Sequence, residues 1–350
     1  MYTLPSSIIP FHIFIFLSLC QPRRILSLLA RLHALQAPKN VDAFWNAERC
    51  REMEPSSSVF EQQHDVVNTQ YVGNWHYNYR SRGMKTSTDD VIVAYMACAS
   101  TSSSKDNISR YVDFGCGIGS TLLLVDYNLC PLESIGMEAQ EQSFQLLQET
   151  IRTLPDTNTL KVIHIDLRKD GILEPLSVQL ITANPPYAPL SSGTLCKDEQ
   201  RRGARFEMRG GVEEYCNAAK RLLTKDGRFI LSFWQQNHGD RRVRKAASNA
   251  GLKVFRTIDV YMGDASESVP HITVYELIHS AKSDEIHSSR CNVNNIEPEW
   301  LGPFSTVTPV TVDQNGEELH EMKFILNITK THGQGYSSNY ESIRKKLNMT

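Results

Sequence analysis

The chain has 350 residues, of which 41% are hydrophobic and 22% charged, as in ordinary soluble globular proteins. The first 41 residues carry four basic side chains and no acidic one, so the rest of the chain, with 33 basic and 39 acidic residues, has a formal charge of −6. That charge excludes indiscriminate coating of nucleic acid, and any RNA binding must use a local basic patch. The eight cysteines form no C-x-x-C pair, which argues against a zinc site and against a disulfide scaffold, so we expect no metal.

The first 41 residues predict a targeting leader. "SSIIPFHIFIFLSLC" is too short for a membrane span and resembles the apolar core of a signal peptide, but no basic residue precedes it. "QPRRILSLLARLHALQAPK" is free of acids, carries arginine and has apolar residues at helical spacing, which is typical of an organelle transit peptide. We therefore expect a mitochondrial or plastid location and no stable membrane span in the mature chain. The alternative is an upstream extension without function, on a cytoplasmic protein.

The rest of the chain divides by composition. Residues 42–70 are polar and irregular and predict a linker, whereas strand-like and helix-like segments alternate from 71 to 280. The expected strands are "RYVDF", "ESIGME", "KVIHID", "VQLITA", "RFILSFW", "LKVFRTIDVY" and "HITVYELI". The expected helices are "TLLLVDYNL", "AQEQSFQLLQETIRTL", "GVEEYCNAAKRLLTKDG" and "DRRVRKAASNAG". Beyond them we expect a polar insertion at 281–309, a closing strand segment of the same domain at 310–327, and a flexible tail at 328–350.

This alternation predicts an α/β fold, a doubly wound and mostly parallel sheet with helices on both faces. In such a sheet, ligands bind outside the carboxyl ends of the strands. Residues that directly follow strands are therefore the candidates for a functional site.

A glycine-rich turn, "DFGCGIG", follows the first of these strands. Gly115, Gly117 and Gly119 allow a sharp turn and a close approach of a ligand to the backbone, beside a helix N-terminus. Their spacing is G-x-G-x-G, not the G-x-G-x-x-G of dinucleotide sites. Asp113 can accept a hydrogen bond from an ammonium group, which S-adenosylmethionine carries and a pyrophosphate lacks. The alternative is a turn that serves packing only.

Acidic residues close the next two strands. Glu138 ends "SIGME" and suits a bidentate contact to ribose hydroxyls. Asp166 in "HIDLRKD" could meet an adenine amino group. Taken alone, each could equally be a solvated acid at a helix start or a turn residue.

The fourth strand ends in "ANPPYAPL". Two adjacent prolines provide no backbone N–H, so the chain must leave the sheet here. The side-chain oxygen of Asn184 and the carbonyl of Pro185 would then offer two acceptors, which match the two N–H groups of a planar –NH2. Accepting both hydrogen bonds directs the nitrogen lone pair toward an electrophilic methyl group, and Tyr187 offers a face on which a base or an amide can stack.

These segments together resemble a known family. "DFGCGIG" with "NPPY" is similar to the S-adenosylmethionine-dependent methyltransferases of adenine N6 or glutamine N5 nitrogens. "TSTDDVIVAYMACAS" and "ARFEMRGGVEEYCNAAKRLLTKDGRFILSF" resemble, more narrowly, the bacterial tRNA (adenine-N6) methyltransferases that modify a valine tRNA beside the anticodon. "VTPVTVDQNGEELHEMKFILN" is similar to that family's closing strand pair, so the resemblance spans 64–327. Phe206 stands where the family usually has His, and "TKDG" replaces a K-P-G-G type of turn.

The resemblance implies a Rossmann-like, seven-stranded sheet with an antiparallel last strand. It implies S-adenosyl-L-methionine as cofactor and methyl transfer to adenine N6 of RNA, with tRNA as the expected partner. The residues that match the family are Asp113, Gly115, Gly117, Gly119, Glu138 and Asp166 for the cofactor, and Asn184, Pro185, Pro186 and Tyr187 for catalysis. The alternatives are a protein glutamine-N5 methyltransferase acting on a release factor and a non-catalytic RNA-binding factor; the glycine spacing argues against a nicotinamide oxidoreductase.

Two basic segments are candidates for RNA contact. Arg201, Arg202 and Arg205 come shortly after the proline turn and are our predicted substrate-binding residues, because arginine contacts phosphates and stacks on bases. The run "DRRVRK" at 240–245 is equally consistent with phosphate contact and with a solvated helix face.

Overall fold

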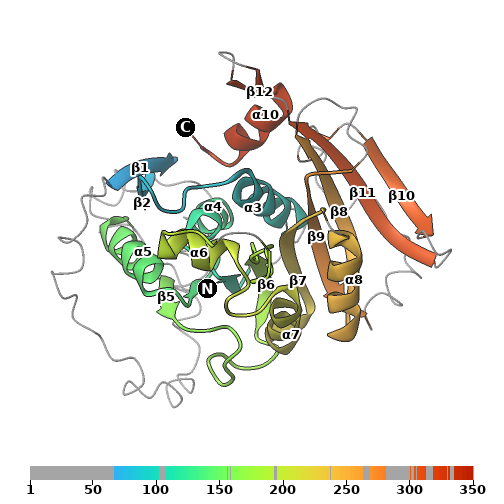
Figure 1. The fold of residues 1–350 in the computed structure, drawn as a ribbon, viewed down its shortest axis with the longest axis horizontal. Coiled ribbons are helices and arrows are strands. Elements are labelled where there is room, and N and C mark those ends of the chain that lie inside the picture. The colour runs from blue at the N-terminus through green and yellow to red at the C-terminus, as the bar shows by residue number, and fades with distance from the viewer. Residues whose placement is uncertain are drawn as a thin grey trace, which may run out of the picture. The chain divides into compact units, whose positions relative to one another are not determined.

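The fold is that of a computed structural model, which describes residues 67–101, 108–155, 157, 159–192, 195–236, 238–262, 269–280, 300, 303–304, 306–312, 318–328, 330–331 and 335–349 (Figure 1). They belong to one compact unit, Asp65–Thr350. The predicted leader, most of the predicted linker and most of the predicted insertion lie outside the described residues.

A nine-stranded sheet forms the centre of this unit. Its strands, in spatial order, are β10 (Thr306–Val312), β11 (Glu318–Ile328), β8 (Leu252–Met262), β9 (Ile272–His279), β7 (Leu223–Trp234), β6 (Val178–Ala183), β3 (Arg110–Phe114), β4 (Glu133–Glu138) and β5 (Leu160–His164). β9 and β10 run antiparallel to their neighbours, and the other described strands of the sheet are parallel.

The predicted seven-stranded sheet is confirmed within this larger one. From β3 to β9 the chain forms the order β5-β4-β3-β6-β7-β9-β8, and β9, the last of the seven along the chain, is the antiparallel strand. The fold class is therefore a Rossmann-like, doubly wound sheet. The closing strand pair, however, is β8 and β9 rather than 306–328, which instead adds β10 and β11 beyond β8.

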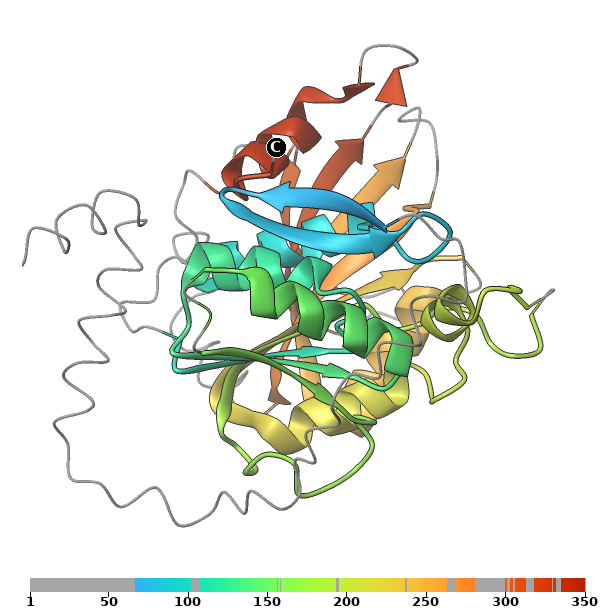
Figure 2. The same cartoon turned by 90° about the vertical axis from the view of Figure 1, so that its left-hand side faces the viewer.

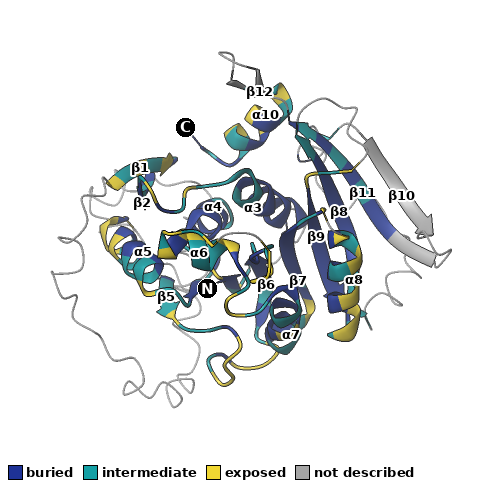
Figure 3. Ribbon diagram, in the orientation of Figure 1, coloured by how far each residue is buried: buried dark blue, intermediate teal, exposed yellow. Residues whose placement is uncertain are grey.

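Helices cover both faces of the sheet (Figure 1). The helices are α3 (Thr88–Thr101), α4 (Ser120–Leu129), α5 (Glu141–Thr153), α6 (Glu199–Arg205), α7 (Val212–Leu222), α8 (Gly239–Asn249) and α10 (Ser338–Lys346). Successive strand residues enter opposite cores: Tyr111 and Leu180 pack with α3, α4 and α5, whereas Val112 and Ile181 pack with α7 and α8. The strands of the sheet are accordingly mostly buried, as expected for a sheet covered on both faces, whereas the outer sides of helices such as α5 and α8 are exposed (Figure 3).

The chain before α3 forms a hairpin, where the sequence predicted linker up to residue 70. Strands β1 (Val67–Val72) and β2 (Trp75–Arg80) pair antiparallel, and Trp75 and Tyr77 are buried. Trp75 and Tyr77 therefore belong to the core of this unit.

The expected flexible tail is also wrong for residues 335–349. Strands β12 (Lys330–Thr331) and β13 (Gly335–Tyr336) precede α10, which buries Tyr340 and Ile343. The segment then reaches the β1–β2 hairpin, where the backbone N–H of Gly73 donates to the carbonyl of Asn348 at 2.7 Å (Figure 2). Tyr340 and Ile343 are three positions apart, so they lie on the same face of α10 and pack together against the protein. No helix in the described ranges has the length and apolar character needed to cross a bilayer.

Candidate active site

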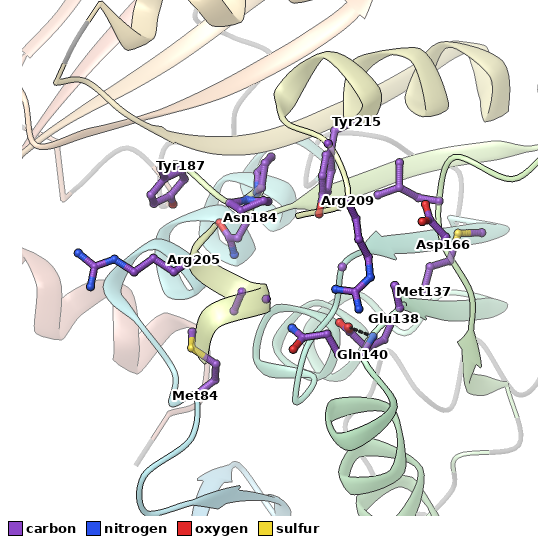
Figure 4. Close-up of a pocket in the computed structure, with 18 of the residues that line it drawn as sticks. Met84, Met137, Glu138, Gln140, Asp166, Asn184, Tyr187, Arg205, Arg209 and Tyr215 are labelled. Carbon is purple, nitrogen blue, oxygen red and sulfur yellow. Dashed lines mark hydrogen bonds between the residues drawn. The ribbon is translucent and has the colours of Figure 1, made fainter. Parts of the chain in front are cut away.

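A cavity of about 410 Å³ opens at the carboxyl ends of four parallel strands (Figure 4). Gly115 follows β3, Glu138 ends β4, Asp166 follows β5, and Asn184 to Tyr187 follow β6; all of them line the cavity. The rest of the wall includes the segment before α3 and the first turn of α3, α6, the loop after α6, and Tyr215 of α7. Seven of the ten residues predicted for the cofactor and for catalysis therefore line one space, at the edge expected for a sheet of this type, and Asp113, Gly117 and Gly119 do not line it.

Of the three glycines in the glycine-rich turn, only Gly115 lines this cavity. Gly115 and Gly119 have positive φ angles of 62° and 90°, which side chains rarely adopt. A Cβ at Gly115 would lie 2.8 Å from the Tyr215 hydroxyl, and one at Gly119 would lie 2.5 Å from Leu147. Gly117 and Gly119 do not line the cavity; Gly117 instead donates its N–H to Glu138.

Glu138 is buried and held by backbone donors. One carboxylate oxygen accepts from Gly117 N at 2.7 Å, and the other accepts from Gln140 N at 2.6 Å. Burial raises its pKa, although these hydrogen bonds and the nearby charge of Arg209 oppose that effect. Figure 4 shows the Arg209 guanidinium extending toward Glu138. Since each carboxylate oxygen can accept a second hydrogen bond, Glu138 can still bind a pair of vicinal hydroxyls.

Asp166 is fixed by its neighbour Arg168. The Arg168 Nε donates to Oδ1 at 2.9 Å and its Nη2 donates to Oδ2 at 2.6 Å, a bidentate pair. These hydrogen bonds lower the pKa of Asp166, which therefore remains an ionised acceptor at the cavity wall.

Asp113 lies behind the cavity wall, not on it. It is 2% exposed, and Oδ1 accepts from the Thr182 hydroxyl at 2.6 Å. Burial, together with the charges of Asp90 and Glu138, raises its pKa to about 8. Asp113 can therefore act on a ligand in the cavity through its charge. The direct contact with an ammonium group that the sequence predicted is not available, because Asp113 does not line the cavity.

Asn184 is held by side chains from three different elements. Its Nδ2 donates to Asp90 Oδ1 of α3 at 2.7 Å and to Thr121 Oγ1 of α4 at 3.2 Å. Its Oδ1 accepts from Ser232 Oγ of β7 at 2.6 Å. Burial raises the pKa of Asp90 to about 6 against the hydrogen bonds from Ser87. Because an ionised carboxylate only accepts hydrogen bonds, Asp90 fixes which way the amide of Asn184 points.

The ring of Tyr187 is anchored as well. Its hydroxyl donates to Asp89 Oδ2 at 2.5 Å and lies 2.7 Å from Ser232 Oγ, and its ring packs edge-on against Phe233. Asp89, Tyr187, Ser232 and Asn184 thus form one continuous series of side-chain contacts. The resulting rigidity orients the ring before a substrate arrives.

The predicted substrate-binding arginines divide into two groups. Arg201 and Arg205, one helical turn apart on α6, line the cavity, and the Arg205 guanidinium points away from Asn184 (Figure 4). Arg202 does not line the cavity; it pairs with Glu199 at 3.2 Å.

Sequence reasoning missed Asp89, Asp90 and Ser232 as site residues. The two aspartates stand in the "TSTDD" segment that carried the family resemblance, and their position directly before a buried helix was the signal that could have found them. Ser232 is the polar residue within the apolar strand "RFILSFW", and the pairing of Ala183 with Leu231 places it beside Asn184. Within the described part of the chain, no cluster of three His, Cys, Asp or Glu residues could hold a metal ion.

Comparison with known proteins gives a partial match. No protein-family model matches the chain. Over 123 residues it is 28% identical to a tRNA1(Val) (adenine(37)-N6)-methyltransferase of Yersinia pestis, and equally to one of Yersinia pseudotuberculosis, covering 35% of this chain and 49% of each relative. The chain thus spans about half the length of the curated relatives it matches. The similarity is to methyltransferases, in agreement with the resemblance seen in the sequence motifs.

Solved structures give weaker similarity. A predicted O-methyltransferase from Agrobacterium tumefaciens matches with a TM-score of 0.43 and 12% identity, over 74% of this chain and 97% of that one. TYW2 from P. horikoshii, in complex with MeSAdo, matches with a TM-score of 0.41 and 13% identity, over 61% and 71% of the two chains. The fold class rests on the strand order described above.

Proposed function

We propose that this protein is an S-adenosylmethionine-dependent methyltransferase that transfers a methyl group to the N6 nitrogen of an adenine in RNA, with tRNA as the substrate. The observation that carries the proposal is the single cavity that joins Glu138 and Asp166 to the turn Asn184–Tyr187. One end offers acceptors for a ribose and an adenine. The other end offers acceptors for a planar amino group, so a cofactor and a methyl acceptor can lie in contact.

The electrostatics favour a cationic cofactor. Asp90, Asp113 and Glu138 are buried near one another, and the pKa of each is raised, first of all by burial. A cation in the cavity would stabilise their ionised forms, whereas a pyrophosphate would be repelled. S-adenosylmethionine carries a sulfonium and an ammonium group, so its charge matches this site.

Methyl transfer to an amino group depends more on alignment of the nitrogen lone pair with the methyl carbon than on removal of a proton from the nitrogen before it attacks. Asn184 Oδ1 keeps one lone pair beside the hydrogen bond from Ser232, and the Pro185 carbonyl is free of any helix. Two such acceptors would hold the –NH2 group so that its lone pair attacks the methyl carbon while the carbon–sulfur bond breaks. The sulfur then becomes a neutral thioether, and the methylated nitrogen loses one proton to water. Positioned acceptors of this kind contribute most of their effect in the transition state.

The RNA part of the proposal rests on two supports. The curated relatives are named for N6 methylation of adenine in tRNA1(Val), and the resemblance at "NPPY" and "TSTDD" points the same way. Arg201 and Arg205 at the cavity wall form no ion pair with another described residue and suit the phosphates or base faces of an RNA strand.

The test is transfer of tritiated methyl from labelled S-adenosylmethionine to an unmodified valine tRNA transcript, followed by digestion to nucleosides. We expect label in N6-methyladenosine with the wild-type chain and near absence of label with Asn184→Ala. Label in a glutamine of a release factor and none in RNA would move the protein to the glutamine-N5 class. RNA binding with no transfer to either acceptor would indicate a non-catalytic RNA-binding factor.

The acid-free leader supports a proposed organelle location. Residues 1–45 fused to a fluorescent protein should direct it to mitochondria or plastids. A diffuse cytosolic signal would support the upstream extension without function, and an endoplasmic-reticulum pattern would support the signal-peptide alternative.

A further inference from the structure

The basic run at 240–245 separates into two kinds of side chain in the structure. Arg242 and Arg244 are engaged in ion pairs: Arg242 contacts Glu207 at 2.5 Å and Glu213 at 2.7 Å, and Arg244 contacts Glu321 at 2.6 Å. Arg241 and Lys245, one turn apart on α8, are exposed and have no ion pair or hydrogen bond from their side chains within the described residues. Half of the run is therefore structural, and half is accessible to a ligand.

The free cations line a second hollow. This groove, of about 490 Å³, lies between the first turn of α7 and α8 and is lined by His238, Arg241, Lys245 and Asn249, together with the Arg242–Glu213 pair. We call it the α7–α8 groove. Arg241, Lys245 and Asn249 follow one another at intervals of four residues, so they form a line of donors along one helix face.

One end of the groove, at His238 and Glu213, lies at the same edge of the sheet as the active-site cavity. α7 and α8 both begin at the carboxyl edge, because α8 follows the carboxyl end of β7, the strand next to β6. A continuous series of contacts joins the two sites: Ala188, after the catalytic turn, exchanges backbone hydrogen bonds with Arg205 and Glu207, and Glu207 binds Arg242. A polymer that places one unit in the cavity can thus extend toward the groove.

We propose that the α7–α8 groove binds a backbone phosphate of the RNA substrate next to the nucleotide that enters the active site. The inference rests on the proposed function and adds a second point of contact to it. Arginine and lysine neutralise phosphates, and the Asn249 amide and the His238 imidazole provide hydrogen-bond donors to the same strand. RNA is favoured over an acidic protein because a regular line of donors matches the repeating phosphates of one strand. The net acidic character of the chain also makes such a local patch necessary.

The test compares two double variants with equal loss of charge. Arg241→Ala/Lys245→Ala empties the groove of free cations. Arg152→Ala/Lys225→Ala removes an exposed arginine of α5 and an exposed lysine at the opposite, amino end of β7. Binding of an unmodified valine tRNA transcript to the full chain is measured from low to moderate salt, and methyl transfer is measured at saturating cofactor.

We expect the groove variant to bind the transcript about tenfold more weakly at low salt and the control variant to bind as the wild type does. The slope of log K against log salt should become shallower by about 0.7 to 0.9 for each phosphate that the protein no longer neutralises. KM for RNA should rise while kcat and cofactor affinity stay unchanged. Arg241→Lys/Lys245→Arg should restore RNA affinity, because the charge is retained.

The outcomes separate this inference from the proposed function. Equal RNA affinity of the groove and control variants, with methylation of RNA intact, overturns the groove and leaves the function standing. Weaker RNA binding by the groove variant, with no methyl transfer to RNA by the wild type, supports the groove and overturns the function. A wild type that does not bind RNA, or a groove variant that loses only methylation of a protein acceptor, overturns the groove as an RNA site.

Discussion

The two ends of the active-site cavity are built differently. At the cofactor end, Glu138 is held by backbone N–H groups of Gly117 and Gln140, and Asp166 by Arg168, two residues further along the chain. At the acceptor end, Asn184 is held only by side chains, which come from α3, α4 and β7. The cofactor end is thus fixed mainly by strand-end backbone and near neighbours. The acceptor end exists only once distant parts of the chain have packed together.

This difference predicts that the two ends fail separately. Substitutions at the cofactor end should weaken cofactor binding with little effect on turnover at saturation. Substitutions at the acceptor end should lower turnover and leave cofactor affinity unchanged.

Asn184→Ala is expected to have the largest effect. Loss of one well-placed acceptor in the transition state typically costs about 10²–10³ in kcat. Cofactor affinity should stay the same, because Asn184 faces the acceptor end. Single-turnover methyl transfer and calorimetry on the same preparation measure both quantities, and equal losses in the two would remove the distinction between the ends.

Glu138→Gln tests the cofactor end with nearly unchanged shape. The side-chain amide nitrogen of glutamine cannot accept a hydrogen bond, so one of the two backbone N–H groups that now donate to the carboxylate would lose its acceptor. A hydrogen bond to a charged group contributes about 1.5–3 kcal/mol. We expect cofactor affinity to fall by roughly tenfold to a hundredfold and kcat at saturating cofactor to change little. Binding measured by calorimetry that matches the wild type would contradict the assigned role of Glu138.

Ser232→Ala should have a moderate effect on turnover. It removes the donor to Asn184 Oδ1 and a hydrogen-bond partner of the Tyr187 hydroxyl, at a cost of about 1 kcal/mol or roughly fivefold in kcat. Ser232→Thr keeps the hydroxyl and serves as the matched control. If the alanine variant retains full kcat while both variants are folded, the hydrogen bond does not position Asn184.

The pH dependence of cofactor binding tests the cofactor end without any substitution. Asp113, with its pKa raised to about 8, holds a proton in the free protein at neutral pH, and a bound cation favours its ionised form. Binding therefore releases a proton, and affinity should rise with pH from 6 to 7.5, by at most about tenfold per pH unit. Calorimetry with 5′-methylthioadenosine, which lacks the sulfonium and ammonium charges, is the control. Equal pH dependence for both ligands would show that Asp113 does not sense the cofactor's charge.

Much of the cofactor end could be predicted from sequence because its residues directly follow strands. Alternation of strands and helices indicates the sheet, and the sheet brings strand ends together, so Glu138, Asp166 and Asn184 converge as expected. The position of Asp113 behind the wall could not be predicted, because it depends on the hydroxyl of Thr182 across the neighbouring strand. Arg202 was grouped with its neighbours by composition, whereas its pairing with Glu199 depends on the short helix that both share.

The acceptor end was only partly predictable for the same reason. Asp90 and Thr121 lie 94 and 63 residues away from Asn184 along the chain, so no local pattern connects them. The prediction of a flexible tail at 328–350 was wrong for α10 because this helix is mostly polar. Its buried residues Tyr340 and Ile343 are covered by partners in α3 and the hairpin, which the local sequence does not reveal.

The contact between Gly73 and Asn348 has a consequence for how the protein is made. Val72 also bridges to Met349, so the first described strand meets the last described residue. The ribosome adds Gly73 about 275 residues before Asn348. The contact between the two segments therefore cannot form until the residues between them have been synthesised. The β1–β2 hairpin carries Arg80, which contacts Asp198, the N-cap of α6, and α6 contributes to the cavity wall. During synthesis the hairpin is therefore made early, but it gains its C-terminal neighbour only after residues 348 and 349 have been added, later than every strand of the sheet.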